Sequence, residues 1–227
     1  MEINAEVHAL PYFRGGGNDE DSSGQHRRLA EDTEETPYGV EQVQADQLKD
    51  IPLPDPDKKR TVCVVDTGYD ANHEDLPGAS YGVNGFVPNG YSGSWDVDGH
   101  GHGTHCAGTI GAIGNNEVGV TSVNPDPNKF TFFIGKGLSD SGSGTSDGVI
   151  EAVEACRANG ANIISMSLGG GGFSSINNDV YNDLYSDDIL VIAAAGNDVS
   201  QLVASIHYTC RLYYCWILTQ IIPSFFT

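Results

Sequence analysis

Three histidines lie close together in the stretch DGHGHGTHCAGT, residues 98–109: His100, His102 and His105. Imidazole groups in such a cluster either ligate a metal ion or transfer protons. Three neutral imidazoles can hold zinc and leave a fourth position open for water. Proton transfer to and from a serine instead needs one histidine as base, a carboxylate that orients it, and hydrogen-bond donors for the oxyanion. The stretch alone leaves both chemistries open.

The zinc alternative rests on the spacing His-x-His-x-x-His, which is similar to that of the metallo-β-lactamase hydrolases. That family has an acid just before the third histidine, where this chain has Thr104. Such a site needs further ligands downstream, and His207 is the one later histidine. A zinc-dependent hydrolase using His100, His102 and His105 is therefore kept as an alternative.

The surrounding sequence predicts strands that alternate with helices. The stretch TVCVVDTG, residues 61–68, is a short β-branched apolar run, typical of a buried parallel strand. Further strands are predicted at 129–138, 161–170 and 189–197, and helices at 37–48, 102–114, 147–160 and 177–188. This order indicates an α/β fold with a mostly parallel sheet. Functional side chains gather at the carboxyl ends of such strands, where Asp66 and Asn197 lie.

Four motifs occur in one order between residues 37 and 198: VVDTG, HGTHCAG, SMSLGG and AAAGN. In these motifs the chain resembles the subtilisin-like serine endopeptidases, or subtilases. The resemblance implies a three-layer α/β fold, with a mostly parallel sheet and helices on both faces, incomplete at the C-terminus. It also implies hydrolysis of peptide bonds through an acyl-enzyme, with protein or peptide substrates.

The resemblance assigns roles to individual residues. Asp66 would orient the base, His102 would act as general base and acid, and Asn197 would donate to the oxyanion. His105 would be structural, whereas His100 matches no family position and is interpreted as a solvated turn residue. Six residues on two segments would pair by backbone with an extended substrate: Gly142, Ser143, Gly144, Ser167, Leu168 and Gly169.

A structural calcium site is also implied. The loop GNNEVGV, residues 114–120, is similar to a subtilase loop that holds calcium through oxygen ligands. The expected ligands are the side chains of Asp75 and Asn116 and the carbonyls of Gly114, Val118 and Val120. Glu34 is a possible further ligand.

The nucleophile of the family has no counterpart here. Subtilases place it in a Gly-Thr-Ser-Met-Ala type of motif beyond the oxyanion Asn. The sequence Gly144-Thr145-Ser146 precedes Asn197, so we interpret Ser146 as a helix N-cap. We therefore expect the chain as written to be inactive or poorly folded. A catalytically dead, peptide-binding relative of the peptidases stays open as the alternative.

The sequence is divided into three parts. Residues 1–36 are interpreted as a flexible linker or a remnant of an inhibitory propeptide, and residues 37–198 as a partial peptidase domain. Residues 199–227 lack the acidic bias and glycines of the preceding region and resemble no subtilase segment. Truncation or mis-splicing would explain that change in character. No apolar run there is long enough to span a membrane.

Composition restricts the partners and the compartment. With 31 acidic against 11 basic side chains, the chain repels phosphate backbones, which argues against nucleic acid. Cys63, Cys106 and Cys156 lie in apolar or small-residue surroundings and are expected to be free buried thiols. No signal peptide is visible, although the resemblance implies an extracellular protein. We expect a monomer.

Overall fold

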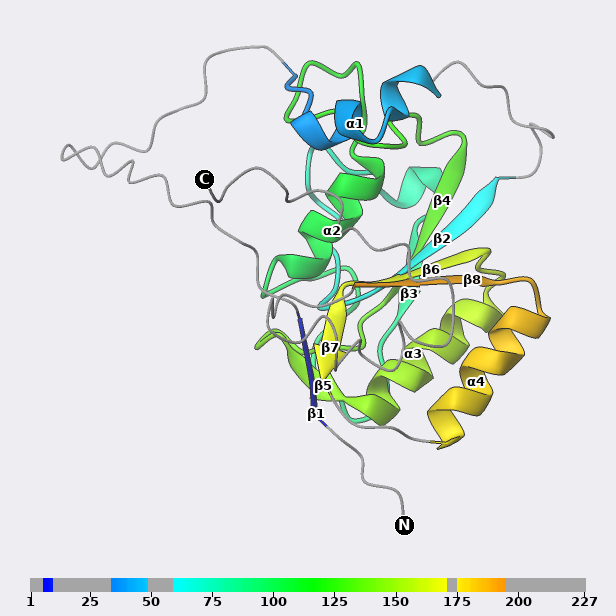
Figure 1. Ribbon diagram of the computed structural model, residues 1–227. Helices are drawn as coiled ribbons and strands as arrows, with labels where there is room; N and C mark the ends of the chain where they lie inside the picture. Colours follow the sequence, from blue (N-terminus) through cyan, green and yellow to red (C-terminus); the bar gives the residue numbers. More distant parts are fainter. Residues whose placement is uncertain (1–5, 10–33, 49–58, 171–174, 195–227) are drawn as a thin grey trace, which may run out of the picture.

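The central layer of the molecule is a parallel sheet of five strands (Figure 1). The computed structural model describes residues 6–9, 34–48, 59–170 and 175–194. Across the sheet the strand order is β3 (Asn84–Phe86), β4 (Phe130–Gly135), β2 (Arg60–Val65), β6 (Ile163–Met166) and β8 (Leu190–Ala193). All four strand pairs are parallel, so the carboxyl ends of all five strands share one edge. Asp66 follows the middle strand at that edge.

Helices cover both faces of this sheet because the strands are apolar on both sides. Val62 and Val64 of β2 pack in the core cluster that includes Ala107 of α2 (His102–Gly111). Cys63 and Val65 point to the opposite cluster, which contains side chains of α3 (Ser146–Ala158) and α4 (Ser175–Ser186). Figure 1 shows α2 on one side and α3 and α4 on the other. The predicted three-layer α/β fold is therefore confirmed.

Several element boundaries differ from those predicted. The expected helix at 37–48 is two short pieces, α1 (Tyr38–Gln42) and η1 (Ala45–Gln47), and a further 3-10 turn, η2, spans Ala79–Tyr81. The N-cap of α3 is Thr145, whose hydroxyl accepts from the backbone N–H of Gly148, so the assignment of Ser146 as the cap was wrong. Thr145 has the extended backbone that an N-cap requires, whereas Ser146 is already helical.

A second, antiparallel sheet of three strands lies beside the central one. The predicted strand at 161–170 is divided, because β7 (Leu168–Gly170) leaves the parallel sheet after β6. In the small sheet, β1 (Glu6–Ala9) lies between β5 (Ser143–Thr145) and β7. The sequence analysis expected no strand near the N-terminus. The alternation of side chains in β1 is typical of a strand with one buried face, since Val7 is buried while Glu6 and His8 are exposed.

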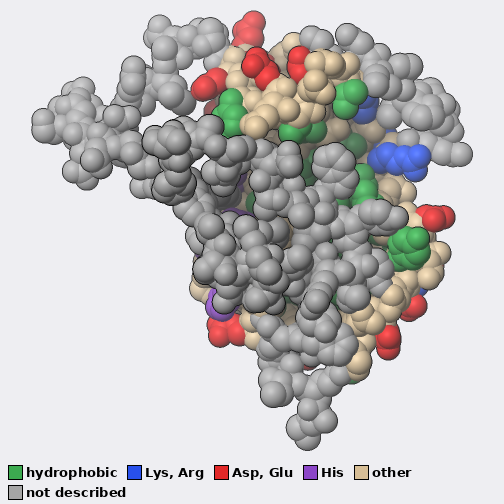
Figure 2. Space-filling model, in the orientation of Figure 1, with side chains coloured by type: hydrophobic (Ala, Val, Ile, Leu, Met, Phe, Trp, Pro, Cys, Tyr) green, Lys and Arg blue, Asp and Glu red, His purple; other side chains and the backbone are tan. Residues whose placement is uncertain are grey.

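The distribution of charged and apolar side chains can be compared with the composition of the sequence. Acidic side chains lie near the edges of the face shown in Figure 2, in keeping with the net charge of −20. Within the described residues, no helix combines the length and the apolar character that crossing a membrane requires.

One covalent bond crosses the core. Cys63 of β2 and Cys156 of α3 form a disulfide with their Cα atoms 5.9 Å apart, and both side chains are fully buried. The expectation of free buried thiols was therefore wrong for these two residues. Cys106 is free, as expected, but it is half-buried rather than buried. The separation of Cys63 and Cys156 by 93 residues concealed the pairing, because only the packing of α3 against β2 brings the two positions together.

We predict that the double variant Cys63→Ala/Cys156→Ala is less stable by about 2–4 kcal/mol, because the unfolded chain regains the entropy that the cross-link removes. Urea unfolding followed by circular dichroism measures this difference. Cys106→Ala serves as the control. A double variant whose unfolding midpoint matched that of Cys106→Ala would show that the bond contributes nothing to stability.

Candidate active site

A buried carboxylate–imidazole pair lies at the carboxyl edge of the central sheet. Oδ1 of Asp66 lies 2.6 Å from Nδ1 of His102, and the two side chains are 0% and 3% exposed. Oδ1 of Asp66 also accepts from the backbone N–H of Thr67 at 2.8 Å. Asp66 follows β2 directly and His102 is the first residue of α2. The bond fixes Nδ1 of the imidazole against the carboxylate, as a general base requires.

Glycine at position 103 allows the start of α2 to approach this strand end. A Cβ at Gly103 would collide with the carbonyl oxygen of Gly68 and would lie 3.1 Å from Cβ of Asp66. The N–H of Gly103 donates to the hydroxyl of Thr67 at 2.9 Å. The spacing HGTH therefore has a geometric reason, since only a residue without a side chain brings His102 within hydrogen-bond distance of Asp66.

Asp98 holds the same two segments together and was missed by the sequence analysis. Its Oδ1 accepts from the hydroxyl of Thr67 and the N–H of Gly101, both at 2.9 Å. Its Oδ2 accepts from the N–H and hydroxyl of Thr104 at 2.9 and 2.6 Å. Burial alone would raise the pKa of Asp98, but the hydrogen bonds to Thr104, Gly101 and Thr67 lower it. The position of Asp98 shortly before the start of α2 was the sequence feature that could have identified it as a functional residue.

Lys136 connects the pair to the small sheet. Its ammonium group is fully buried at the end of β4 and donates to the carbonyl of Thr67, to that of Val97 at 3.2 Å and to Asp140 Oδ1 at 2.6 Å. The hydrogen bond from Lys136 lowers the pKa of Asp140. Asp140 precedes β5, so the turn after Asp66 and the loop leading to β5 share one buried cation.

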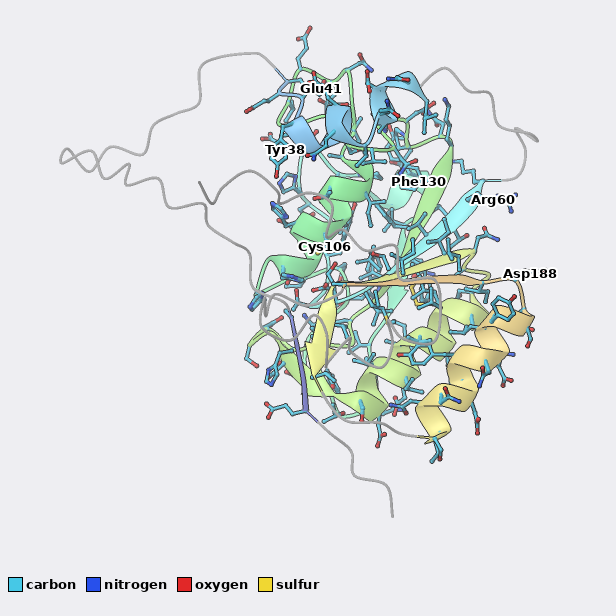
Figure 3. All side chains as sticks on the ribbon, viewed as in Figure 1. Tyr38, Glu41, Arg60, Cys106, Phe130 and Asp188 are labelled. Carbon is cyan, nitrogen blue, oxygen red and sulfur yellow. A yellow bond between two sulfur atoms is a disulfide. The ribbon has the colours of Figure 1, made fainter. Side chains whose placement is uncertain are left out.

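The three histidines of the opening motif do not assemble into one metal site. Among the described residues, the group of side chains placed to ligate one ion is Asp66, His102 and Cys106, without His100 or His105. Cys106 lies on α2 (Figure 3), with Sγ 3.8 Å from Nδ1 of His102. The ring centroids of His100 and His102 are 6.2 Å apart. This geometry favours proton transfer over the zinc alternative.

The six residues expected to bind substrate by backbone line the two outer strands of the small sheet. Ser143 and Gly144 belong to β5, with Gly142 just before it. Leu168 and Gly169 belong to β7, with Ser167 between β6 and β7. β1 is hydrogen-bonded between these strands, with His8 opposite both Ser143 and Gly169. Five of these residues, all except Ser167, therefore lie opposite an extended segment that the chain itself supplies.

Asn197, the expected oxyanion donor, lies outside the described residues. The strand before it, β8, is parallel to β6 and ends at Ala193. Asn197 therefore follows a strand that ends at the same edge as Asp66.

The expected calcium ligands lie together away from the His102 pair. Asp75 is 2% exposed, and its Oδ1 and Oδ2 accept from Nδ2 of Asn116 and the N–H of Val120, both at 2.9 Å. Glu34 accepts from the N–H of Asn116 at 3.1 Å. Alternate residues of the loop have positive φ (Asn115, Glu117 and Gly119), so its peptide orientation changes at every second residue. Gly114, Val118 and Val120 lie at the intervening positions, in a set of oxygen donors that suits a hard cation.

The pKa of His102 reflects its partner. Burial by itself lowers it, but the hydrogen bonds to Asp66 and Cys106 and the charge of Asp66 raise it well above its ordinary value. Burial and the nearby charge of His102 lower the pKa of His105. Because the pKa of His102 is raised in the folded state, its pairing stabilises the fold fully below pH 6.5 and is lost as pH rises through the folded pKa.

We predict that His102 titrates above its ordinary pKa of 6.5 and that Asp66→Asn lowers its pKa, because the amide removes the stabilising negative charge. An NMR titration of the imidazole signals measures both values, with His102→Gln assigning the resonance. A pKa for His102 that is the same in the wild-type and Asp66→Asn chains would contradict the role given to the carboxylate.

Comparison with known proteins agrees with the fold and with the geometry of the Asp66–His102 pair. The model of the subtilase family matches residues 57–217. The match extends past residue 198, where the sequence analysis ended the peptidase domain, into a part of the chain that the structure does not describe.

Individual relatives agree with the family match. Subtilisin DY of Bacillus licheniformis is 36% identical over 167 residues, 72% of this chain and 56% of that protein. Thermitase of Thermoactinomyces vulgaris is 38% identical over 160 residues, 70% of this chain and 54% of thermitase. The crystal structure of the psychrophilic subtilisin-like protease Apa1 from the Antarctic psychrotroph Pseudoalteromonas sp. AS-11 has a TM-score of 0.61 at 37% identity, covering 73% of this chain and 36% of that one.

The chain spans about half the length of the curated relatives named above. The family match covers most of the chain, and the solved structure shares its layered α/β arrangement. The chain belongs to the subtilase family.

Proposed function

We propose that this protein is a serine endopeptidase that cleaves peptide bonds through an acyl-enzyme. The observation that carries the proposal is the buried Asp66–His102 pair at 2.6 Å, on a sheet edge next to two strands that hold an extended peptide segment. His102 would take the proton of a serine and return it to the leaving amine. Asn197 would stabilise the oxyanion, a contribution of about 10²–10³ in rate.

The nucleophile is the part of this mechanism that the sequence does not provide. No serine after Asn197 lies in a Gly-Thr-Ser type of motif. Ser146, the first residue of α3, precedes Asn197 in the chain, whereas the nucleophile of the family follows the oxyanion Asn. We infer that the 227-residue chain binds peptides without cleaving them, with a residual site limited to binding and oxyanion stabilisation.

The substrate groove in this proposal is the space that β1 occupies between β5 and β7. An extended peptide there gains backbone hydrogen bonds on both edges, such as that from the N–H of Ala9 to the carbonyl of Gly142 at 2.8 Å. Selectivity comes from alternate side chains. Val7 is 6% exposed and packs in the cluster that contains Leu138 and Leu168, so the groove favours an apolar residue at that position.

We further propose that the segment containing β1 is the inhibitory remnant considered in the sequence analysis. Its strand uses the groove's hydrogen-bonding groups, so a substrate must displace it. A non-catalytic peptide-binding protein is the second candidate function, favoured by the two-sided groove between β5 and β7.

Displacing β1 tests the groove. We predict that Val7→Asp releases the strand, because an aspartate cannot occupy the apolar site of Val7 without a large desolvation cost. A fluorescent peptide with the sequence of residues 4–10 should then bind at least about tenfold more tightly than to wild type, as expected from the ~1.5–3 kcal/mol that burying a valine contributes. Anisotropy measures the affinity.

Glu6→Gln is the matched control, since Glu6 is exposed on the same strand and its change should leave the groove occupied. If Val7→Asp does not fold, as judged by circular dichroism, a chain starting at residue 11 replaces it. If the chain folds, β1 has left its position and no peptide binds, the proposed groove is wrong.

Two further observations separate the peptidase from the peptide-binding candidate. Hydrolysis of casein by the 227-residue chain, abolished by His102→Ala, would overturn the inference that it lacks a nucleophile. Sequencing of the transcript and the genomic DNA beyond the codon for Asn197 shows whether the gene encodes a nucleophile motif. A splice form continuing into a Gly-Thr-Ser-x-x-x-Pro segment supports the peptidase, and its absence supports the peptide-binding protein.

We also propose that the loop at 114–120 binds calcium. The Asp75 and Asn116 side chains would supply ligands with the carbonyls of Gly114, Val118 and Val120, and Glu34 would add a further carboxylate. Calcium would neutralise the two carboxylates and stabilise the loop, without a role in the chemistry at His102.

We predict that calcium raises the melting temperature relative to chelator, because binding to the folded state alone stabilises it by about 2.7 kcal/mol at a hundredfold excess over Kd. Asp75→Asn should remove most of the increase, whereas Asp46→Asn, a change on an exposed turn, should retain it. Equal melting temperatures of the wild-type chain in calcium and in chelator would contradict the proposal.

The buried Cys63–Cys156 disulfide supports an extracellular location, since disulfides form and persist in oxidising compartments. We propose that the protein acts there on peptides as a monomer, and that its strong negative charge disfavours nucleic acid.

A further inference from the structure

The outer side of β5 is closed by the phenol of a tyrosine. β5 is an outer strand of the small sheet, with β1 on its inner side. The N–H of Ala9 donates to the carbonyl of Gly142, and in an antiparallel ladder the hydrogen-bonded pairs alternate with non-bonded ones. Gly142 and Gly144 therefore turn their backbone groups toward the groove, whereas Ser143 and Thr145 turn theirs away from it.

Two of the outward backbone groups of β5 have partners outside the sheet. The carbonyl of Ser143 accepts from the N–H and the hydroxyl of Ser139, both at 2.8 Å. The N–H of Thr145 donates to the hydroxyl of Tyr91 at 2.9 Å. Unpaired polar groups on an outer strand leave it open to pairing with another chain. Tyr91 therefore supplies a hydrogen bond that a neighbouring strand would otherwise supply.

Two glycines make room for this phenol. A Cβ at Gly144 would lie 2.7 Å from the hydroxyl of Tyr91, and a Cβ at Gly148 would collide with that hydroxyl and lie 2.7 Å from Cζ of the ring. Gly148 belongs to α3, although glycine is less favourable than alanine inside a helix. The phenol of Tyr91 occupies the space that a side chain on either glycine would take, which explains both glycines.

The turn that carries Tyr91 is fixed independently of the groove. The N–H of Tyr91 donates to the carbonyl of Pro88 at 3.2 Å, and the N–H of Asn89 donates to Oε2 of Glu151 on α3 at 3.1 Å. The hydroxyl of Tyr91 also lies 3.5 Å from Oγ1 of Thr145, the N-cap of α3. The half-buried phenol is thus positioned against the end of β5 by the turn and by the start of α3.

We propose that Tyr91 is a positioning residue of the peptide groove. Its hydroxyl holds the end of β5 in place, so that Gly144 pairs with the backbone of a bound peptide at the position that Val7 takes in β1. The inference rests on the proposed groove between β5 and β7. Tyr91 acts through the backbone of β5, so its effect applies to an extended peptide whatever side chains that peptide carries.

Phenylalanine at position 91 keeps the ring and removes the hydroxyl. In the Val7→Asp chain, which releases β1, we expect Tyr91→Phe to weaken binding of the fluorescent peptide of residues 4–10 about three- to tenfold, as for the loss of one hydrogen bond. Tyr38→Phe in the same chain is the control, because Tyr38 is 75% exposed. Anisotropy measures the affinities, and circular dichroism confirms folding.

Two N-methylated peptides separate positioning from a general loss of stability. Methylation of the Val7 nitrogen removes the N–H that faces Gly144, and methylation of the Ala9 nitrogen removes the N–H that faces Gly142. We expect Tyr91→Phe to weaken the peptide methylated at Ala9 as much as the unmodified one. It should weaken the peptide methylated at Val7 by less than about twofold, because the two changes affect the same interaction.

The possible failures are distinguishable. Equal affinities of the Tyr91→Phe and Tyr38→Phe chains for the unmodified peptide would overturn the positioning role, and so would equal weakening of both methylated peptides. If Tyr91→Phe does not fold, Gly148→Ala replaces it, since its methyl group displaces the hydroxyl from Thr145. If the Val7→Asp chain itself folds with β1 released and binds no peptide, the proposed groove is wrong.

Discussion

The contact on which the rest of the site depends is the approach of the first turn of α2 to the end of β2. Gly103 sits against the Gly68 carbonyl with no room for a side chain. That contact brings two separate elements together, because β2 delivers Asp66 and α2 delivers His102 to one hydrogen-bonded pair. Oδ1 of Asp66 is bonded to both Nδ1 of His102 and the N–H of Thr67, whereas Oδ2 is buried without a hydrogen-bond partner among the described residues.

Two side chains outside this pair connect it by hydrogen bonds to the segments next to the small sheet. Asp98 fastens the start of α2 to Thr67, and Lys136 fastens the carbonyl of the same Thr67 to Asp140. Asp140 stands at the head of the loop that becomes β5. The start of α2, with His102, and the loop before β5 are therefore positioned by one network of charged hydrogen bonds, and Thr67 is its common member.

Much of this arrangement was predictable from local sequence. The β-branched run before Asp66, the glycines around His102 and the amphipathic stretch at 147–160 each specify an element by period or sterics. The features that escaped prediction depend on distant partners. The Cys63–Cys156 bond requires the packing of α3 on β2, and β1 is four residues whose strand conformation depends on two edges more than a hundred positions away.

Asp98 escaped for a related reason. Its carboxylate serves donors on both sides of the site, so its role is visible only once Thr67 and Thr104 lie on either side of it. His100 was expected to be a solvated turn residue, and it is exposed in the structure. Its contact with Gly142 appears only after the loop before β5 has folded against it.

The position of β1 within its own chain has a consequence for access to the proposed groove. A ligand attached to its receptor competes at a fixed local concentration, of millimolar order for a short tether, which dilution of the protein does not change. A second molecule therefore binds when its own concentration and affinity exceed those of the tethered strand. It also binds after the connection to β1 is cut and the freed strand diffuses away. A single chain cleavage would thus convert a unimolecular equilibrium into a bimolecular one that favours opening in dilute solution.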